Sequence, residues 1–200
     1  MSAVSKLDYS FDLGQLESDI KVILQMGDIN RQNQLCLTYC PTKNIHPDGE
    51  LHQGAGSLHY EMRLEGETVH KHIRPKPLSE RDFVDFIPFI KHLYIYEVYK
   101  RLKGQFNIGR MRLMKLNPGQ CLTWHRDVSQ RIHIPIQTNP GNRLVVDDRV
   151  YFLPAGKAYL VDTRHMHTAF NGGPDVRYNI LVSTVPTEEE ERTFLESYKK

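Results

Sequence analysis

The sequence has few cysteines and no long apolar run. Its three cysteines, Cys36, Cys40 and Cys121, are too few and too scattered for a disulfide framework, which favours a reducing compartment. No run of about 18 apolar residues occurs, so we expect no transmembrane helix and no membrane partner. The N-terminal MSAVSKLDYS lacks the apolar stretch of a secretory signal. Together these absences predict a cytoplasmic protein.

Charge of one sign is also scarce. The 200 residues include 26 basic and 24 acidic side chains, for a formal net charge of +2, which gives no electrostatic reason to expect a nucleic-acid partner. The one short basic run, HKHIRPK at residues 70–76, is flanked by acidic residues and is interpreted as a solvated loop. The length suits a single domain over residues 1–200, whose oligomeric state the sequence leaves unknown.

The N-terminal portion, residues 1–107, is predicted to be helical and irregular. Apolar residues recur on one face of a helix from Asp12 to Gln25, with Asp12 as its N-cap. A second helical region is expected from Ser79 to about Leu102, divided by Pro88, because a proline inside a helix removes a hydrogen bond. The intervening residues 30–77 are predicted to be irregular, with short strands near 35–38 and 58–64.

From residue 108 to 186 the pattern changes to short strands separated by turn residues. The runs are GRMRLMKLN, CLTWH, RIHIPIQ, RLVV, RVYFL, KAYLVD, HTAFN and VRYNILVSTV. Seven or eight strands at this spacing indicate a sandwich or barrel, so residues 108–186 are the expected core. The chain then closes with a short helix within residues 187–200, because Thr187 and Glu190 have the spacing of a capping box.

Several of these strands alternate between apolar and polar residues. In residues 131–137 three isoleucines share one face, while Arg131 and His133 share the other; Arg110 and Arg112 likewise lie together in their strand. This alternation by itself favours a sheet with an apolar core face and a solvated polar face. A barrel with helices covering its apolar outer face and polar side chains converging inside fits the same pattern.

His125 and Asp127 form an H-x-D pair. On an extended backbone two residues this far apart project to the same side and can bind one ion. A second histidine would complete a facial triad of two histidines and one carboxylate, and the candidates are His165 and His167. Arg177, ten residues beyond His167 and across a glycine-rich turn, could return to the metal and bind a carboxylate. A surface salt bridge is the competing interpretation of Arg177.

The segments RMRLMKLNPGQCLTWHRD, RIHIPIQTN and PAGKAYLVDTRHMHTAFNGGPDVRYNILV resemble the aspartyl/asparaginyl β-hydroxylase-like family of Fe(II)/2-oxoglutarate-dependent dioxygenases. The resemblance covers residues 108 to 185 and implies a mainly β, double-stranded β-helix (jelly-roll, cupin-like) barrel with the N-terminal helices on its outer face. It implies Fe(II) bound by His125, Asp127 and His167, with His167 preferred over His165 by its spacing to Asn171 and Arg177.

The resemblance also implies a co-substrate site and a reaction. Arg177 would bind the C5 carboxylate of 2-oxoglutarate, and Arg131 and His133 would lie near its C1 carboxylate. With dioxygen, an unactivated C–H bond of an amino acid, peptidyl residue or related small carboxylate metabolite would be hydroxylated, releasing succinate and CO2.

The substrate is not defined by the sequence, which favours an amino acid or another small molecule. Two alternatives stay open. One is a cupin-like metal or small-molecule binding protein without oxygenase activity; the other is an interaction protein, which would require the triad residues not to converge. Five further side chains are candidates for the pocket, although a structural role is favoured for each: Tyr60, Arg63, Arg74, Arg110 and Trp124.

Overall fold

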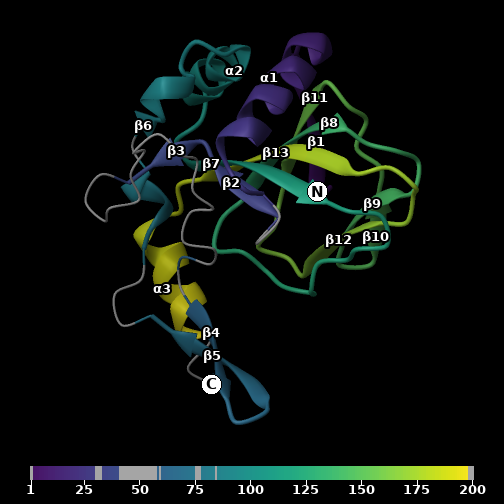
Figure 1. Cartoon of the computed structure of the whole chain (residues 1–200). Helices are drawn as coiled ribbons and strands as arrows, with labels where there is room; N and C mark the ends of the chain where they lie inside the picture. Colours follow the sequence, from purple (N-terminus) through teal and green to yellow (C-terminus); the bar gives the residue numbers. More distant parts are fainter. Residues whose placement is uncertain are drawn as a thin grey trace.

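Two β-sheets face each other in the computed structural model, which describes residues 2–29, 33–40, 58, 60–74, 78–83 and 85–197 (Figure 1). The larger sheet has the strand order β1-β11-β8-β13-β7-β2 and the smaller one β10-β9-β12. The strand bounds are β1 Val4–Ser10, β2 Gln34–Cys36, β7 Ile108–Leu116, β8 Arg131–Gln137, β9 Asn142–Val146, β10 Arg149–Tyr151, β11 Lys157–Val161, β12 His167–Asn171 and β13 Arg177–Thr184.

The chain alternates between the sheets from β7 onward. After β7 in the larger sheet, the segment from Cys121 to His125 joins the smaller sheet through isolated bridges to Phe170 and His167 of β12. The chain then returns to the larger sheet in β8, crosses to β9 and β10, returns in β11, crosses to β12 and ends in β13. Eight antiparallel segments with this connectivity form a jelly roll. The predicted double-stranded β-helix is therefore confirmed.

Helix α1, Leu13–Met26, covers the outer face of the larger sheet together with α2, Tyr94–Lys103 (Figure 1). The predicted start of α1 is confirmed, because the Asp12 carboxylate accepts a hydrogen bond from the Gln15 backbone N–H at 3.0 Å. Asp19 of α1 in turn accepts from the Ile95 N–H at 2.7 Å and so caps the start of α2.

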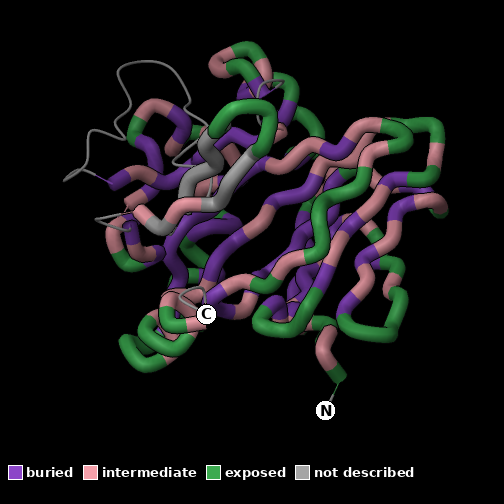
Figure 2. Tube along the Cα trace, turned by 90° about the horizontal axis from the view of Figure 1, so that it is seen from below, coloured by how far each residue is buried: buried purple, intermediate pink, exposed green. Residues whose placement is uncertain are grey.

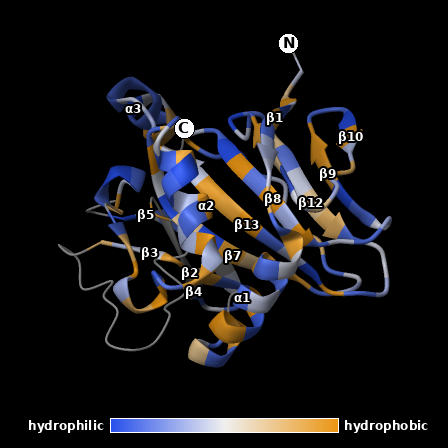
Figure 3. Cartoon of the chain, turned by 90° about the horizontal axis from the view of Figure 1, so that it is seen from above, coloured by the Kyte–Doolittle hydropathy of each residue, from blue (hydrophilic) through white to orange (hydrophobic). Residues whose placement is uncertain are grey.

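A single apolar core joins these helices to the sheet. Hydrophobic residues of β8 and β13 lie beside the helices in Figure 3, and the buried strand positions appear in Figure 2 as the continuous interior of the molecule. The fully or almost fully buried members on the sheet are Leu35, Met111, Leu113, Ile132, Ile134, Ile136, Ala158, Ile180 and Val182. The isoleucine face of β8 thus packs under helices, as the barrel interpretation requires.

The second helical region differs from the prediction over its first half. Residues 80–82 form a 3₁₀ turn, η2, whose capping box between Ser79 and Asp82 closes after one turn. The short strand β6, Asp85–Phe86, follows and pairs with β3, Thr38–Tyr39. Pro88 begins a second 3₁₀ turn, Pro88–Ile90, and a continuous helix forms only from Tyr94. The prediction of helix between Ser79 and Leu93 is wrong, because tertiary pairing and a proline override the periodicity.

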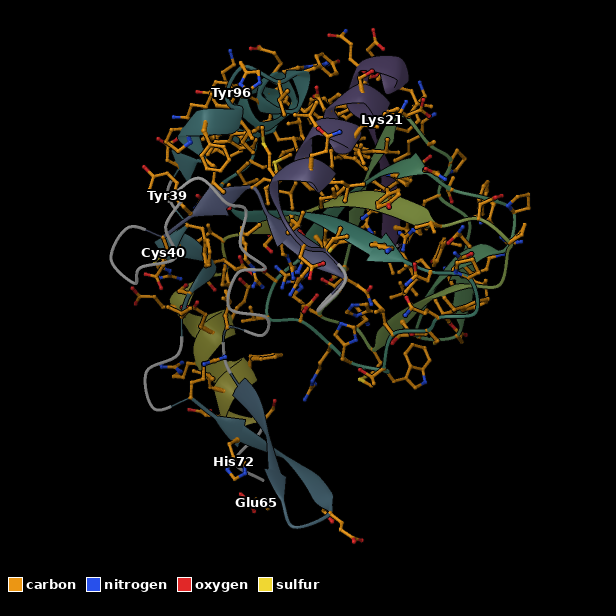
Figure 4. The ribbon with its side chains drawn as sticks, in the orientation of Figure 1. Lys21, Tyr39, Cys40, Glu65, His72 and Tyr96 are labelled. Carbon is orange, nitrogen blue, oxygen red and sulfur yellow. The ribbon has the colours of Figure 1, made fainter. Side chains whose placement is uncertain are left out.

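Strand β1 was not expected in the N-terminal portion, whereas strands overlap both predicted positions, near residues 35–38 and 58–64. Strand β1 pairs with β11 and adds an edge to the larger sheet. Strands β4, Tyr60–Glu65, and β5, Thr68–Ile73, form a hairpin whose turn uses Gly66 at φ 64°. This hairpin, marked by Glu65 and His72 in Figure 4, projects away from the two sheets. Residues 30–77 therefore contain more regular structure than predicted.

Helix α3, Glu188–Glu196, confirms the expected C-terminal helix. Its capping box is complete, with the Glu190 N–H donating to Thr187 Oγ1 at 3.1 Å and the Thr187 N–H donating to Glu190 Oε2 at 2.8 Å. Arg81 of η2 holds α3 through Glu191 at 3.2 Å. In the part of the chain that the structure describes, no helix is long and apolar enough to cross a membrane.

Candidate metal centre

Three side chains converge between the two sheets. One ligand atom from each of His125, Asp127 and His167 lies within 4.8 Å of the other two. The backbones of His125 and His167 are paired, since each N–H donates to the other's carbonyl, at 3.1 and 2.8 Å. The Asp127 N–H donates to the Thr163 carbonyl at 2.7 Å. Backbone pairing on the smaller sheet therefore places the predicted triad side by side.

Hydrogen bonds hold both imidazoles in the orientation that a metal ligand needs. Nδ1 of His125 lies 2.7 Å from the Thr123 carbonyl, and Nδ1 of His167 lies 3.0 Å from the His165 carbonyl. A carbonyl only accepts, so each Nδ1 is the protonated nitrogen and each Nε2 keeps its lone pair. Burial also lowers the pKa of His167, which favours its neutral form.

Asp127 is ionised in this site. Burial alone would raise the pKa of Asp127, but the charge and hydrogen bond of Arg131 hold it well below its usual range, with smaller contributions from His167 and His125. Arg131 Nε donates to Asp127 Oδ2 at 3.0 Å. Arg131 Nη1 donates to Glu80 at 3.0 Å, so the same guanidinium bridges two carboxylates. Two imidazoles and one carboxylate are a donor set that suits a divalent transition metal.

His165, the alternative candidate, lies outside this group. Its Nδ1 is 2.8 Å from an Asp147 carboxylate oxygen, and its side chain is about half exposed. His165 lies in a bend before β12 rather than in the strand, and its imidazole contacts Asp147 instead of the triad. The geometry therefore agrees with the preference for His167.

A cavity of about 270 Å³ adjoins the triad and contains Arg177 in its wall. Arg177 opens β13 and is paired with Leu116 at the end of β7. Burial lowers the pKa of Arg177 to about 10, within the range in which it stays charged at neutral pH. Among the described residues no carboxylate forms an ion pair with Arg177, so the surface salt bridge does not occur there.

His133 and Arg131, the other predicted co-substrate residues, also line the cavity. Both ring nitrogens of the buried His133 lack a hydrogen-bond partner among the described residues. Burial first, and then the nearby charges of Arg177 and His167, lower the pKa of His133 well below its usual value. His133 is thus a neutral ring facing the cavity, whereas Arg131 is already occupied by Asp127 and Glu80.

Glu80 and Gln34 are among the polar residues of the cavity that sequence reasoning missed. Burial would raise the pKa of Glu80, but Arg110, Arg131 and Arg112 hold it below its usual range. Glu80 reaches β7 because Gly109 has no side chain: a Cβ there would overlap the Glu80 backbone. Neither residue has a sequence signal, because the first lies in a 3₁₀ turn 30 residues away from Arg110 and the second in a three-residue strand.

Of the five candidate pocket residues, one lines the cavity, two do not, and two have side chains outside the described residues. Arg110 lines the cavity and pairs with Glu80 at 3.4 Å. Trp124 is about half exposed and is not part of the cavity wall, nor is Arg74. The side chains of Tyr60 and Arg63 lie outside the described residues, as does much of the basic run at residues 70–76.

Comparison with known proteins agrees with the resemblance. The family model for aspartyl/asparaginyl β-hydroxylase matches residues 94–186, and the class of enzyme it indicates is a hydroxylase-type oxygenase. No curated protein sequence matches the chain significantly.

Solved structures show weaker likenesses. An oxidoreductase of the 2OG-Fe(II) oxygenase family from Burkholderia pseudomallei is 14% identical, with 39% of this chain and 44% of that chain covered and a TM-score of 0.36. An RmlC-like cupin family protein with a double-stranded β-helix fold from Methanocaldococcus jannaschii is 14% identical, with coverages of 44% and 76% and a TM-score of 0.36. The chain thus spans less than half of the Burkholderia protein.

At these TM-scores the fold assignment depends on the strand order of the chain itself. The family match covers residues 94–186. The same stretch contains the strands β7 to β13 and the His125–Asp127–His167 group. The predicted resemblance to the aspartyl/asparaginyl β-hydroxylase family is therefore confirmed over residues 94–186.

Proposed function

We propose that the protein is an Fe(II)/2-oxoglutarate-dependent dioxygenase that hydroxylates a C–H bond of an amino acid, a peptidyl residue or a related small carboxylate metabolite. In the balanced reaction, one oxygen atom of O2 enters succinate and the other enters the hydroxylated product, and CO2 leaves from 2-oxoglutarate. His125, Asp127 and His167 would hold the iron, and Arg177 would bind the distal carboxylate of the co-substrate.

The observation that carries this proposal is the pairing of the triad with Arg177 in one small cavity. A metal site alone would suit many proteins. A guanidinium that has no acidic partner among the described residues, on the wall of the same cavity, calls for an anionic ligand beside the metal. A dicarboxylate that reaches both the metal and Arg177 fits that arrangement.

The residues present fit an iron ion. The triad supplies three donors and leaves positions for a chelating co-substrate and dioxygen, and the bound iron would supply the oxidative chemistry. The chain's own task is to bind and orient. Arg131 and the backbone carbonyls fix the ligands, His133 presents a neutral ring to the co-substrate, and Arg177 sets the position of its far end.

A second candidate function is metal or small-molecule binding without turnover, as in cupins. The mixed polar and apolar wall of the cavity would serve such binding equally well. Turnover of 2-oxoglutarate separates the two functions, because a binding protein would not release succinate.

The test is a screen of amino acids and cell metabolites with Fe(II), 2-oxoglutarate and ascorbate, reading succinate and a product heavier by one oxygen atom. We expect metal-dependent succinate formation that one substrate class stimulates. If 2-oxoglutarate binds but succinate never forms with any compound, the binding function replaces the proposed one.

Arg177→Gln is the sharpest variant for the co-substrate. Because a charge-assisted hydrogen bond contributes about 1.5–3 kcal/mol, we expect the KM for 2-oxoglutarate to rise by about 10- to 100-fold with little change in metal affinity. Arg149→Gln is the matched control, since Arg149 is exposed and distant from the cavity wall. An unchanged KM for 2-oxoglutarate in Arg177→Gln would contradict the role of Arg177.

A further inference from the structure

A second arginine in the cavity has no acidic partner among the described residues. Arg112 lies in the middle of β7, is 8% exposed and lines the cavity. Its Nη1 donates to Gln34 Oε1 at 2.9 Å, while its Nε has no hydrogen-bond partner in the described part of the chain. A buried guanidinium with an unused donor, in the wall of a cavity, is costly unless a ligand satisfies it.

Among the described residues, the nearby carboxylates form ion pairs with the neighbours of Arg112 and not with Arg112 itself. Three guanidinium groups, Arg110, Arg112 and Arg131, face two carboxylates, Glu80 and Asp127. Glu80 pairs with Arg110 and Arg131, and Asp127 pairs with Arg131. Burial, followed by repulsion from Arg110 and Arg131, lowers the pKa of Arg112 to about 9, although the charges of Glu80 and Asp127 act in the opposite direction.

Arg112 and Arg177 also stand at different positions along the strands that border the cavity. Along β13, Arg177 pairs with Leu116 and Leu181 pairs with Arg112, so the two arginines are four residues apart along neighbouring strands. At about 3.4 Å per residue this separates their backbones by about 13 Å. Leu181 also pairs with His133 on its other side, which puts Arg112 in the cross-strand row of His133.

We propose that Arg112, held by Gln34, is a second anion subsite that binds a carboxylate of the substrate to be oxidised. This inference rests on the proposed function and names the substrate class as a small free carboxylate. The buried, unpartnered Nε of Arg112 and its positive charge suit a carboxylate, which a guanidinium can bind through two parallel hydrogen bonds. A cavity of about 270 Å³ is at the low end for ligand sites and suits a free metabolite rather than a folded protein segment.

The first test needs no knowledge of the substrate. Protein loaded with Zn(II) and 2-oxoglutarate, labelled with ¹⁵N at arginine, is titrated with acetate and, as a neutral match, with acetamide. We expect the Arg112 Nε–H resonance, assigned by its loss in Arg112→Lys, to shift saturably with acetate only. If this resonance shifts when 2-oxoglutarate is added and does not shift further with acetate, Arg112 belongs to the co-substrate site. If neither ligand moves it, the subsite does not exist.

These results separate the inference from the proposed function. Failure of 2-oxoglutarate to bind the wild-type protein would overturn the proposed function, whatever acetate does. Normal 2-oxoglutarate binding with an unresponsive Arg112 would overturn only the subsite.

The second test uses turnover and stability together. Free amino acids are compared with their amides, and we expect stimulation of succinate formation by the free acids only. In Arg112→Met the KM for the stimulating acid should rise by at least about 10-fold while the KM for 2-oxoglutarate stays unchanged. The thermal midpoint of Arg112→Met should be unchanged or higher, because a buried and repelled charge has been removed. A lower midpoint with an unchanged substrate KM would instead make Arg112 structural.

Discussion

The two faces of the larger sheet are built on opposite principles. The outer face presents Ile132, Ile134 and Ile180 to the two N-terminal helices and is dry and apolar. The inner face presents Arg112, His133 and other polar residues to the cavity. In an ordinary sandwich the space between the sheets is the apolar core. Here polar side chains line part of that space, and the larger apolar cluster lies between the outer face of the larger sheet and the helices.

This difference assigns stability and ligand binding to separate surfaces of the same strands. Substitutions on the outer face should change the free energy of unfolding and leave the chemistry alone. Substitutions on the inner face should change binding and turnover more than stability, with Glu80 as the exception. Single substitutions on each face, measured by both unfolding free energy and turnover, test this division.

His125→Ala should abolish turnover and iron binding with little loss of stability, because it removes a metal ligand on the cavity side. Even partners that only orient metal ligands are worth about 10- to 100-fold, so direct loss of a ligand should exceed that. Succinate formation and metal content after desalting measure the effect. His165→Ala is the matched control and should remain active, since His165 points to Asp147 instead. Activity in His125→Ala, or its loss in His165→Ala, would reassign the triad.

Glu80→Gln should give the largest stability loss on the inner face. Glu80 is 1% exposed and pairs with Arg110 and Arg131, so neutralising it leaves buried guanidinium groups without their counter-charge. Breaking a buried ion pair from one side costs about 3–5 kcal/mol, measured by urea unfolding. Asp82→Asn, in the same 3₁₀ turn, is the control and should cost much less.

The acid dependence of stability gives a second readout for Glu80. The folded-state pKa of Glu80 lies below its usual value of 4.5, so its contribution is fully present above that pH and is lost as pH falls through the folded pKa. Wild-type stability should therefore decline below about pH 4.5, and Glu80→Gln should decline less steeply. Equal slopes in the two proteins would show that Glu80 is not ionised in the folded state.

Ile134→Ala tests the outer face. Ile134 is fully buried against the helices, and truncating a buried isoleucine to alanine typically costs about 2–5 kcal/mol. We expect a loss near 3 kcal/mol in urea unfolding, with unchanged KM values at a temperature where the variant stays folded. A changed KM for 2-oxoglutarate in the folded variant would mean that the two faces are coupled.

The predictability of the two faces from sequence also differs. Period-two alternation and turn residues were enough to predict the strands after residue 108, because these signals are local. The same alternation could not say whether Arg131 and His133 face water or a cavity. That choice depends on α1 and α2 covering the isoleucine face, which is a tertiary contact. The ten-residue spacing from His167 to Arg177 was enough to predict that Arg177 lies near the metal site.

Contacts between distant segments escaped prediction for the same reason. Glu80 meets Arg110 and Arg131 only because η2 packs on the start of β7 beside Gly109. The periodicity of residues 79–93 suggested helix, yet Pro88 and the pairing of β6 with β3 produce short turns instead. Local propensity fails where a segment is shaped by its partners.

Thr187→Ala should have the smallest effect and tests whether α3 belongs to the cavity side. It removes the hydroxyl that accepts the Glu190 N–H, and loss of such an N-cap typically costs about 1 kcal/mol. Phe194 of α3 lines the cavity near Arg126 and Asp127, so fraying of this helix should also weaken substrate binding slightly. Thr187→Ser keeps the cap and should restore both the unfolding free energy and the KM. Among the described residues, α3 contributes none to the apolar cluster under α1 and α2. The losses of unfolding free energy in Ile134→Ala and Thr187→Ala should therefore add in the double variant. A large coupling energy would contradict the independence of the two surfaces.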